Sequence, residues 1–143
     1  MYRLMTECEF DSAHFLKGYP GKCANIHGHR WRVVCEIESE SLQQEGPERG
    51  MLVDFSVLKQ ALKELSNGLD HTLIYEDGTL KPSTVTALED EDFMLVPLPF
   101  TPTAENMAKW FYDAMAEKGL PVSCITVYET PANAASYSPK GAK

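Results

Sequence analysis

The sequence has little basic charge and no long hydrophobic run. Its 143 residues include 13 Lys and Arg against 21 Asp and Glu, which gives a formal net charge of −8. Because no basic segment could displace counterions from phosphates, we expect no binding to nucleic acid or to anionic membranes. No apolar run approaches the ~20 residues that cross a bilayer, and Met1 to Leu4 lack the apolar segment of a secretion signal. We therefore expect a cytoplasmic protein.

Cysteine is also sparse. The four cysteines are scattered without the spacing of a disulfide scaffold, so we expect free thiols in a reducing compartment; they are Cys8, Cys23, Cys35 and Cys124. A chain of this length buries roughly 68–70% of its unfolded surface, so it needs neither disulfides nor a metal merely to remain folded. Without repeats or a change in composition, residues 1–143 are predicted to form a single domain, with Pro139 to Lys143 as a tail.

Two segments near the N-terminus alternate with a period of two. Tyr2 to His14 and His27 to Ile37 each place apolar and histidine side chains on one face and charged side chains on the other. This pattern is typical of strands in an antiparallel sheet that has one solvent-exposed face. The two segments are therefore predicted to pair as long antiparallel strands.

Two helices are expected in the middle of the chain. Apolar residues with i, i+3, i+4, i+7 spacing begin at Leu58, after a possible cap at Asp54 or Ser56, and the pattern ends at Asn67-Gly68. The second helix begins with the capping sequence from Thr103 to Asn106 and ends near Gly119.

The remaining segments complete an α+β fold. Glu76 to Asp92 is rich in charge and is predicted to be a loop excursion, while Phe93 to Phe100 contains two prolines and is typical of an edge or irregular strand. Val122 to Glu129 and Ala134 to Tyr137 are predicted strands. The order strand, strand, helix, helix, strand, strand predicts a four-stranded antiparallel sheet with both helices on one face.

Three histidines fall on the inward faces of the first two strands. His27 and His29, two residues apart, have Cα atoms about 6.6 Å apart and point the same way, and His14 ends the neighbouring strand. A single buried histidine is usually a hydrogen-bonded core residue, but three unpaired imidazoles are costly to bury together without a partner. Three neutral imidazoles with an open fourth position are typical of a catalytic Zn²⁺ site.

Proton-transfer candidates lie near these ligands in the sequence. A Cys23 thiol beside a cation and Lys22 would favour its thiolate, which could act as base or nucleophile; a fourth zinc ligand or an idle loop cysteine are the alternatives. Asp70 directly precedes His71 after the first helix. An Asp that orients a His is a recurring proton-transfer pair, although adjacent residues can also form a simple turn.

Two carboxylates have separate explanations. Glu129 is the charged residue in the apolar row of Ile125 and Val127, where it needs hydrogen-bond donors that the flat edge of a ligand could supply. Glu105 lies in the first turn of a predicted helix, where the helix dipole favours an acid.

Six motifs, spread in order along the chain, resemble the 6-pyruvoyltetrahydropterin synthase/6-carboxytetrahydropterin synthase family. They are FDSAHF (residues 10–15), CANIHGH (23–29), MLVDF (51–55), LDH (69–71), PTAEN (102–106) and YET (128–130). The short spacing of Cys23 to the two following histidines is similar to that of the bacterial 6-carboxytetrahydropterin synthases of queuosine (7-deazaguanine) biosynthesis.

The resemblance implies a tunnelling fold, in which three subunits join their sheets into a barrel. Two such trimers stack as a homo-hexamer, with active sites between subunits. The implied site residues are the Zn²⁺ ligands His14, His27 and His29, the proton-transfer residues Cys23, Asp70 and His71, and the substrate-binding residues Glu129, Thr103 and Glu105.

The resemblance also implies a reaction on a small molecule. It is the zinc-dependent conversion of 7,8-dihydroneopterin triphosphate to 6-carboxy-5,6,7,8-tetrahydropterin, with release of acetaldehyde and triphosphate. A 6-pyruvoyltetrahydropterin synthase, or a zinc- and pterin-binding protein without turnover, are the alternatives.

Overall fold

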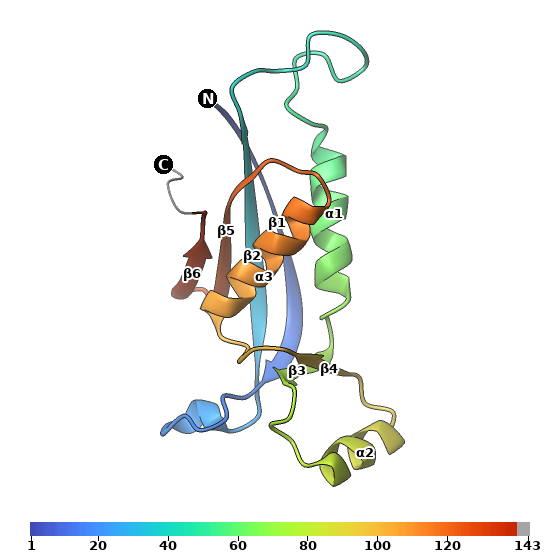
Figure 1. The fold of residues 1–143 in the computed structure, drawn as a ribbon, viewed down its shortest axis with the longest axis vertical. Helices are drawn as coiled ribbons and strands as arrows, with labels where there is room; N and C mark the ends of the chain where they lie inside the picture. Colours follow the sequence, from blue (N-terminus) through green and yellow to red (C-terminus); the bar gives the residue numbers. More distant parts are fainter. Residues whose placement is uncertain (140–143) are drawn as a thin grey trace.

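A six-stranded sheet with two helices packed on one face forms the body of the protein, seen in a computed structural model that describes residues 1–139 (Figure 1). The predicted tail lies, apart from Pro139, outside the described residues. In chain order the elements are β1 (Tyr2–His14), the 3₁₀ turn η1 (Lys22–Ala24), β2 (His27–Ser39), α1 (Phe55–Asn67), β3 (Thr72–Glu76), α2 (Pro82–Asp90), β4 (Leu95–Leu98), α3 (Ala104–Glu117), β5 (Val122–Thr130) and β6 (Asn133–Tyr137). The strand order is β4-β3-β1-β2-β5-β6.

The β1–β2 pair is the longest ladder of the sheet. It runs antiparallel without a register shift, from Tyr2 opposite Ser39 to His14 opposite His27. Side chains that alternate onto the inner face, such as Phe10 and Trp31, are buried, as the period-two pattern predicted. β2 then pairs antiparallel with β5.

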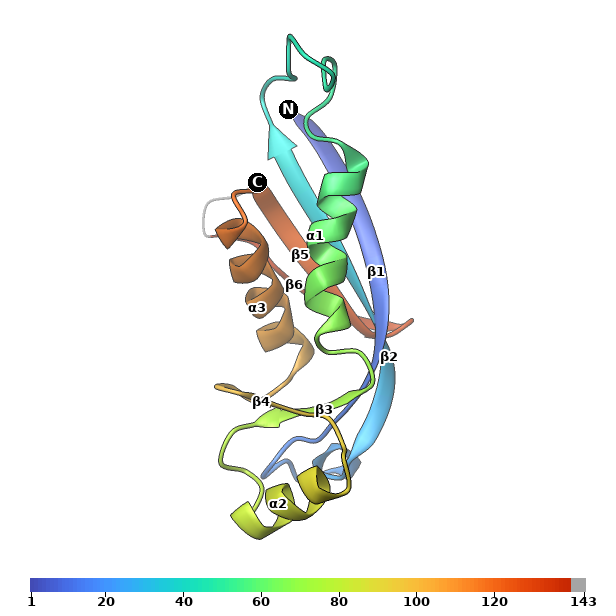
Figure 2. The ribbon, with the colours of Figure 1, turned by 90° about the vertical axis from the view of Figure 1, so that its right-hand side faces the viewer.

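Helices α1 and α3 cover the inner face side by side (Figure 2). Their predicted starts are confirmed: Asp54 caps α1 by accepting a hydrogen bond from Ser56 N at 2.7 Å, and Thr103 Oγ1 caps α3 by accepting one from Asn106 N at 3.2 Å. Their apolar stripes pack against the sheet and form the core; the fully buried members include Leu58, Leu62, Met107, Phe111 and Met115.

The predicted four-stranded, wholly antiparallel sheet was wrong in size and in direction. β3 and β4 extend the sheet beyond β1, and both the β1–β3 and β3–β4 pairs are parallel. Short buried strands in parallel pairing read as brief apolar runs without alternation, so β3 gives little signal in the sequence. The expected edge strand near Pro97 is confirmed, because β4 lies at the end of the sheet.

The predicted loop excursion at Glu76 to Asp92 was also wrong, since most of it is helix α2. Pro82 occupies the start of this helix, where its missing N–H costs nothing. No residue of α2 is buried, so the helix has no apolar stripe that periodicity could reveal. α2 lies at one end of the protein, away from α1 and α3 (Figure 1).

Among the described residues, no helix is both long enough and apolar enough to cross a membrane.

Candidate active site

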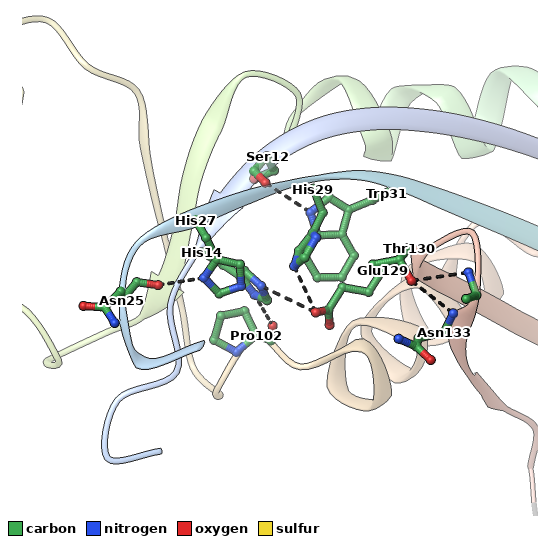
Figure 3. Close-up of polar contacts among 11 residues, drawn as sticks. Ser12, His14, Asn25, His27, His29, Trp31, Pro102, Glu129, Thr130 and Asn133 are labelled. Carbon is green, nitrogen blue, oxygen red and sulfur yellow. Dashed lines mark hydrogen bonds and ion pairs between the residues drawn. The ribbon is translucent and has the colours of Figure 1, made fainter. Parts of the chain in front are cut away.

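The three histidines converge where β1 ends and β2 begins (Figure 3). The register places His14 opposite His27, and His29 two residues further along the same face. The centroids of the rings are 4.5 Å apart for His14 and His27, 5.1 Å for His14 and His29, and 4.9 Å for His27 and His29. The antiparallel ladder alone therefore brings the three predicted ligands together.

Backbone carbonyls orient two of these rings. His14 Nδ1 lies 2.8 Å from the Pro102 oxygen and His27 Nδ1 lies 2.6 Å from the Asn25 oxygen. A carbonyl oxygen only accepts, so each Nδ1 donates and each Nε2 keeps its lone pair, as in ligated histidines. The Nε2 atoms of all three histidines are buried and have no hydrogen-bond partner among residues 1–139. Their chemistry fits a metal ion at the centre of the group.

Burial lowers the pKa of two of these imidazoles, His14 and His29. The side chain of His14 is 1% exposed, and burial lowers its pKa to about 4. Burial also lowers the pKa of His29, against the opposing effect of the nearby Glu129 carboxylate. Because a metal binds the unprotonated ring, His14 needs to lose no proton at neutral pH before it binds one.

Trp31 forms the floor under the histidines. Its ring centroid lies 5.0 Å from that of His14 and 5.6 Å from that of His29, both edge to face. The indole is fully buried, stacks on Phe10 at 6.0 Å and donates from Nε1 to the Ser12 oxygen at 3.3 Å. This packing fixes the ring positions from below.

Glu129 joins the histidine group from β5. Its Oε1 atom lies 2.9 Å from His29 Nε2, at ion-pair distance but outside hydrogen-bond geometry, and 4.0 Å from His14 Nε2. One ligand atom from each of the four side chains lies within 4.8 Å of the others. In a tetrahedral site with zinc–ligand bonds of about 2.0–2.1 Å, two ligand atoms lie about 3.3–3.4 Å apart. This separation falls between the distances from Glu129 Oε1 to His29 Nε2 and to His14 Nε2. The proximity of Glu129 to the histidines was not foreseen from the sequence.

Asp70 and His71 form the expected pair, in the turn between α1 and β3. Asp70 Oδ2 lies 2.8 Å from His71 Nδ1, and Oδ1 accepts a hydrogen bond from Asp11 N at 2.8 Å. His71 N donates in turn to the Asp11 oxygen at 2.6 Å, and His71 takes a left-handed φ of 59°. The Asp11 N–H, and then His71, lower the pKa of Asp70 and keep it ionised. The positioning role of Asp11 left no signal in the sequence.

This pair is separate from the histidine group of the same chain. Asp70 and His71 cluster with the Asp11 carboxylate rather than with the three buried histidines. Side chains of successive strand residues point to opposite faces, so Asp11 and His14 lie on opposite faces of β1. The imidazole of His71 is 78% exposed and faces solvent.

Comparisons with known proteins agree with this geometry. Residues 3–140 match the family model described as 6-pyruvoyl tetrahydropterin synthase. The chain belongs to this family. It is 33% identical over 140 residues to a 6-carboxy-5,6,7,8-tetrahydropterin synthase of Haemophilus influenzae, covering 96% of this chain and 99% of that one. It is 34% identical to the synthase of the same name from Synechocystis, covering 96% and 93%. The resemblance drawn from the six motifs is confirmed.

Solved structures share the fold of this chain. The Caenorhabditis elegans 6-pyruvoyl tetrahydropterin synthase aligns with a TM-score of 0.67 at 20% identity, covering 97% of this chain and 96% of that one. An uncharacterised protein from Wolinella succinogenes aligns with a TM-score of 0.80 at 21% identity, covering 97% and 98%.

The family motifs also highlight Cys23, Thr103 and Glu105. Cys23 is a free, half-buried cysteine in η1, the turn that joins the strands of His14 and His27, and its carbonyl accepts a hydrogen bond from Leu16 N at 2.8 Å. In the described part of the chain its thiol is not a member of the metal-ligand group.

The start of α3 reaches the site through its backbone. Thr103 caps the helix, and the preceding residue, Pro102, supplies the carbonyl that holds His14. Glu105 is exposed in the first turn, where a carboxylate complements the helix dipole. The structure thus gives Thr103 a capping role and places it next to Pro102, which orients a ligand.

Proposed function

We propose that the protein is a zinc-dependent 6-carboxy-5,6,7,8-tetrahydropterin synthase of queuosine biosynthesis. The reaction converts 7,8-dihydroneopterin triphosphate and water to 6-carboxy-5,6,7,8-tetrahydropterin, acetaldehyde and triphosphate. The observation that carries the proposal is the convergence of three buried Nε2 atoms, on His14, His27 and His29, that have no hydrogen-bond partner among residues 1–139. The names of the relatives that match nearly the whole chain supply the substrate class.

Three imidazoles and one carboxylate are a donor set that suits Zn²⁺. His14, His27 and His29 would hold the ion, and Glu129 lies beside it. When bound, the metal supplies a Lewis acid that stabilises negative charge developing on side-chain oxygens of the substrate.

A cavity of about 360 Å³ opens at the end of the sheet beside Glu129 and His29, and Glu9, Arg30, Arg32 and Tyr128 of the charged face also line it. This volume lies within the range of small-molecule sites. The Glu129 carboxylate can accept two N–H groups from the aminopyrimidine edge of a pterin, as a bidentate acceptor. Thr103 and Glu105 complete the proposed substrate-binding residues.

Proton transfer is assigned to Cys23 and to the Asp70–His71 pair. Asp70 holds the Nδ1 proton of His71, so Nε2 is free to accept a proton and the resulting imidazolium stays next to an ionised carboxylate. Cys23 acts from the turn above the histidines on the other side of the reacting carbon. One base on each face allows a proton to be removed and returned.

Assembly into a homo-hexamer would bring the Asp70–His71 pair of one subunit next to the three histidines of another. The exposed imidazole of His71 and the unpaired edges of β4 and β6 support assembly, because open sheet edges pair with neighbours. Three subunits join their sheets into a barrel and two trimers stack. Asp70 and His71 of one subunit then face the histidine group of its neighbour.

Product analysis by mass spectrometry tests the proposal. Zinc-loaded protein incubated with 7,8-dihydroneopterin triphosphate should release acetaldehyde and the 6-carboxy product. Accumulation of 6-pyruvoyltetrahydropterin would instead assign the protein as a pyruvoyl synthase. Pterin binding without any product would make it a binding protein.

The Cys23→Ala variant separates catalysis from metal binding. It should keep its zinc, measured by metal analysis after dialysis, and form no product. Loss of zinc from this variant would make Cys23 a ligand and contradict its assignment as a base.

A further inference from the structure

Glu129 belongs to two sites at once. Its carboxylate reaches the metal-ligand group, where Oε1 lies 2.9 Å from His29 Nε2 (Figure 3). The same residue lines the cavity of about 360 Å³ in which a pterin is proposed to bind. Accepting both N–H groups of a pterin edge uses the best-placed lone pair on each carboxylate oxygen, so the oxygen nearest His29 no longer offers that lone pair to a metal. The two positions of the side chain are therefore alternatives.

Strand pairing is interrupted at Glu129, although the residues on either side of it are paired. In the β5–β6 ladder Tyr128 pairs with Ala134 and Thr130 pairs with Asn133, so Glu129 has no partner. The β2–β5 ladder already ends with Arg32 opposite Tyr128. An extra residue of this kind is a β-bulge, which re-aims its side chain and is common next to active sites.

The residues on either side of the bulge are fixed. The Arg32 guanidinium lies over the Tyr128 ring at 3.8 Å from its centroid. Thr130 Oγ1 accepts hydrogen bonds from Ala132 N at 3.3 Å and Asn133 N at 3.1 Å, which close the turn to β6. In the described part of the chain, the only charged or polar side chains within ion-pair or hydrogen-bond distance of the Glu129 carboxylate are His14 and His29. Rotation of this side chain thus breaks no other polar contact.

We propose that Glu129 is an exchangeable fourth ligand: it binds the metal in the resting protein and leaves it when the aminopyrimidine edge of a pterin offers two N–H donors. Its 2.9 Å and 4.0 Å distances to two ligand nitrogens support the first position, and the adjoining cavity supports the second. The second half of the proposal rests on the proposed pterin function, whereas the first half concerns the metal alone.

The exchange makes the site selective. Only a ligand that draws the carboxylate away exposes the fourth position to a substrate hydroxyl. A diol without an aminopyrimidine edge has no donor pair to offer Glu129 and leaves the position closed. Recognition of the ring and access to the metal are thereby coupled through one residue.

Metal binding by the full-length protein tests the ligand role without turnover. Zinc affinity is measured by competition with a chromophoric chelator, and the visible spectrum is recorded after loading with Co²⁺. Glu129→Gln should weaken zinc binding by at least about tenfold, since substitutions of outer-shell partners alone cost that much, and should change the cobalt spectrum. Glu117→Gln, at the exposed end of α3, is the matched control and should change neither. Unchanged affinity and spectrum in a folded Glu129→Gln variant, checked by circular dichroism, overturn the ligand role.

Neopterin, which has the ring and the side-chain hydroxyls but no triphosphate, tests the exchange. Adding it to the Co²⁺-loaded protein should change the cobalt spectrum, while propane-1,2-diol at the same concentration should not. Neopterin that binds, as measured by quenching of its fluorescence, but leaves the spectrum unchanged overturns the exchange. Failure of neopterin to bind overturns the exchange together with the pterin assignment, but the variant experiment still decides the ligand role independently.

Discussion

Replacing Trp31 with Phe tests the floor of the metal site. The indole is fully buried beneath His14 and His29, and its N–H satisfies the Ser12 carbonyl. A phenyl ring in the same place keeps the stacking on Phe10 but removes the N–H and part of the ring. The substitution therefore acts on both stability and ligand position.

The expected loss of stability has two parts. The lost hydrogen bond to Ser12 costs about 1 kcal/mol. The missing ring carbons, roughly two methylene-sized groups at ~0.8 kcal/mol each, cost ~1.6 kcal/mol. The sum is ~2.6 kcal/mol, which lies below the 3–5 kcal/mol typical of a complete Trp→Ala truncation. Zinc affinity should fall by about tenfold, because the histidine rings lose part of the surface that orients them.

Urea unfolding of the metal-free protein with excess chelator measures the stability change, and chelator competition measures the zinc affinity. Trp110→Phe is the control, since Trp110 is only half-buried and lies on α3, with its ring 4.9 Å from Phe111. This control should keep its zinc affinity. A Trp31→Phe variant as stable as the wild type, with unchanged zinc affinity, would refute the role of the indole as a positioning floor.

Three further predictions concern the other parts of the site. Asp70→Asn should lower turnover by about a thousandfold to ten-thousandfold while the zinc content stays constant. The reason is that an amide N–H facing His71 Nδ1 imposes the wrong tautomer on the imidazole. Normal rates in single-turnover kinetics would contradict this. The pKa of Asp70 is lower in the folded protein than its value near 3.9 in the unfolded chain, so ionised Asp70 stabilises the fold above that pH. This stabilisation is lost as the pH falls through the folded-state pKa. The urea midpoints of the wild type and Asp70→Asn should therefore converge in acid. Thr103→Ala should destabilise the protein by about 1 kcal/mol through loss of the α3 cap, seen in urea unfolding, and a cost near zero would show that the hydrogen bond to Asn106 N contributes nothing.

The parts of the fold that the sequence predicted correctly are those set by local pattern. Period-two alternation in β1 and β2 placed His14, His27 and His29 on one face, and pairing of the two strands then brings them together. The helix caps at Asp54 and Thr103 could also be predicted from the sequence, because a side-chain oxygen just before an apolar stripe is a local signal of a helix start.

The parts that could not be predicted depend on long-range contacts or on backbone groups. β3 pairs with the far end of β1 in parallel, and α2 buries no apolar face, so neither has a periodic signature. The carbonyls of Pro102 and Asn25 orient the ligands, yet every residue has a carbonyl and the sequence does not mark these two. Glu129 approaches His29 through a bulge, which depends on pairing between β5 and β6 rather than on residue type.

The four candidate ligands are held in two different ways, and the difference bears on function. The candidate nitrogen ligands lie on the long β1–β2 ladder, over a buried indole, and the carbonyls of Pro102 and Asn25 hold two of the rings. Such ligands cannot move without disturbing the core, so they suit permanent attachment of a metal. The oxygen ligand, Glu129, lies on an unpaired bulge residue at the rim of a cavity. Three nitrogens on a paired ladder beside one carboxylate on a bulge form the arrangement that the proposed exchange requires, because the metal would keep its nitrogen ligands while the carboxylate gives way to a substrate.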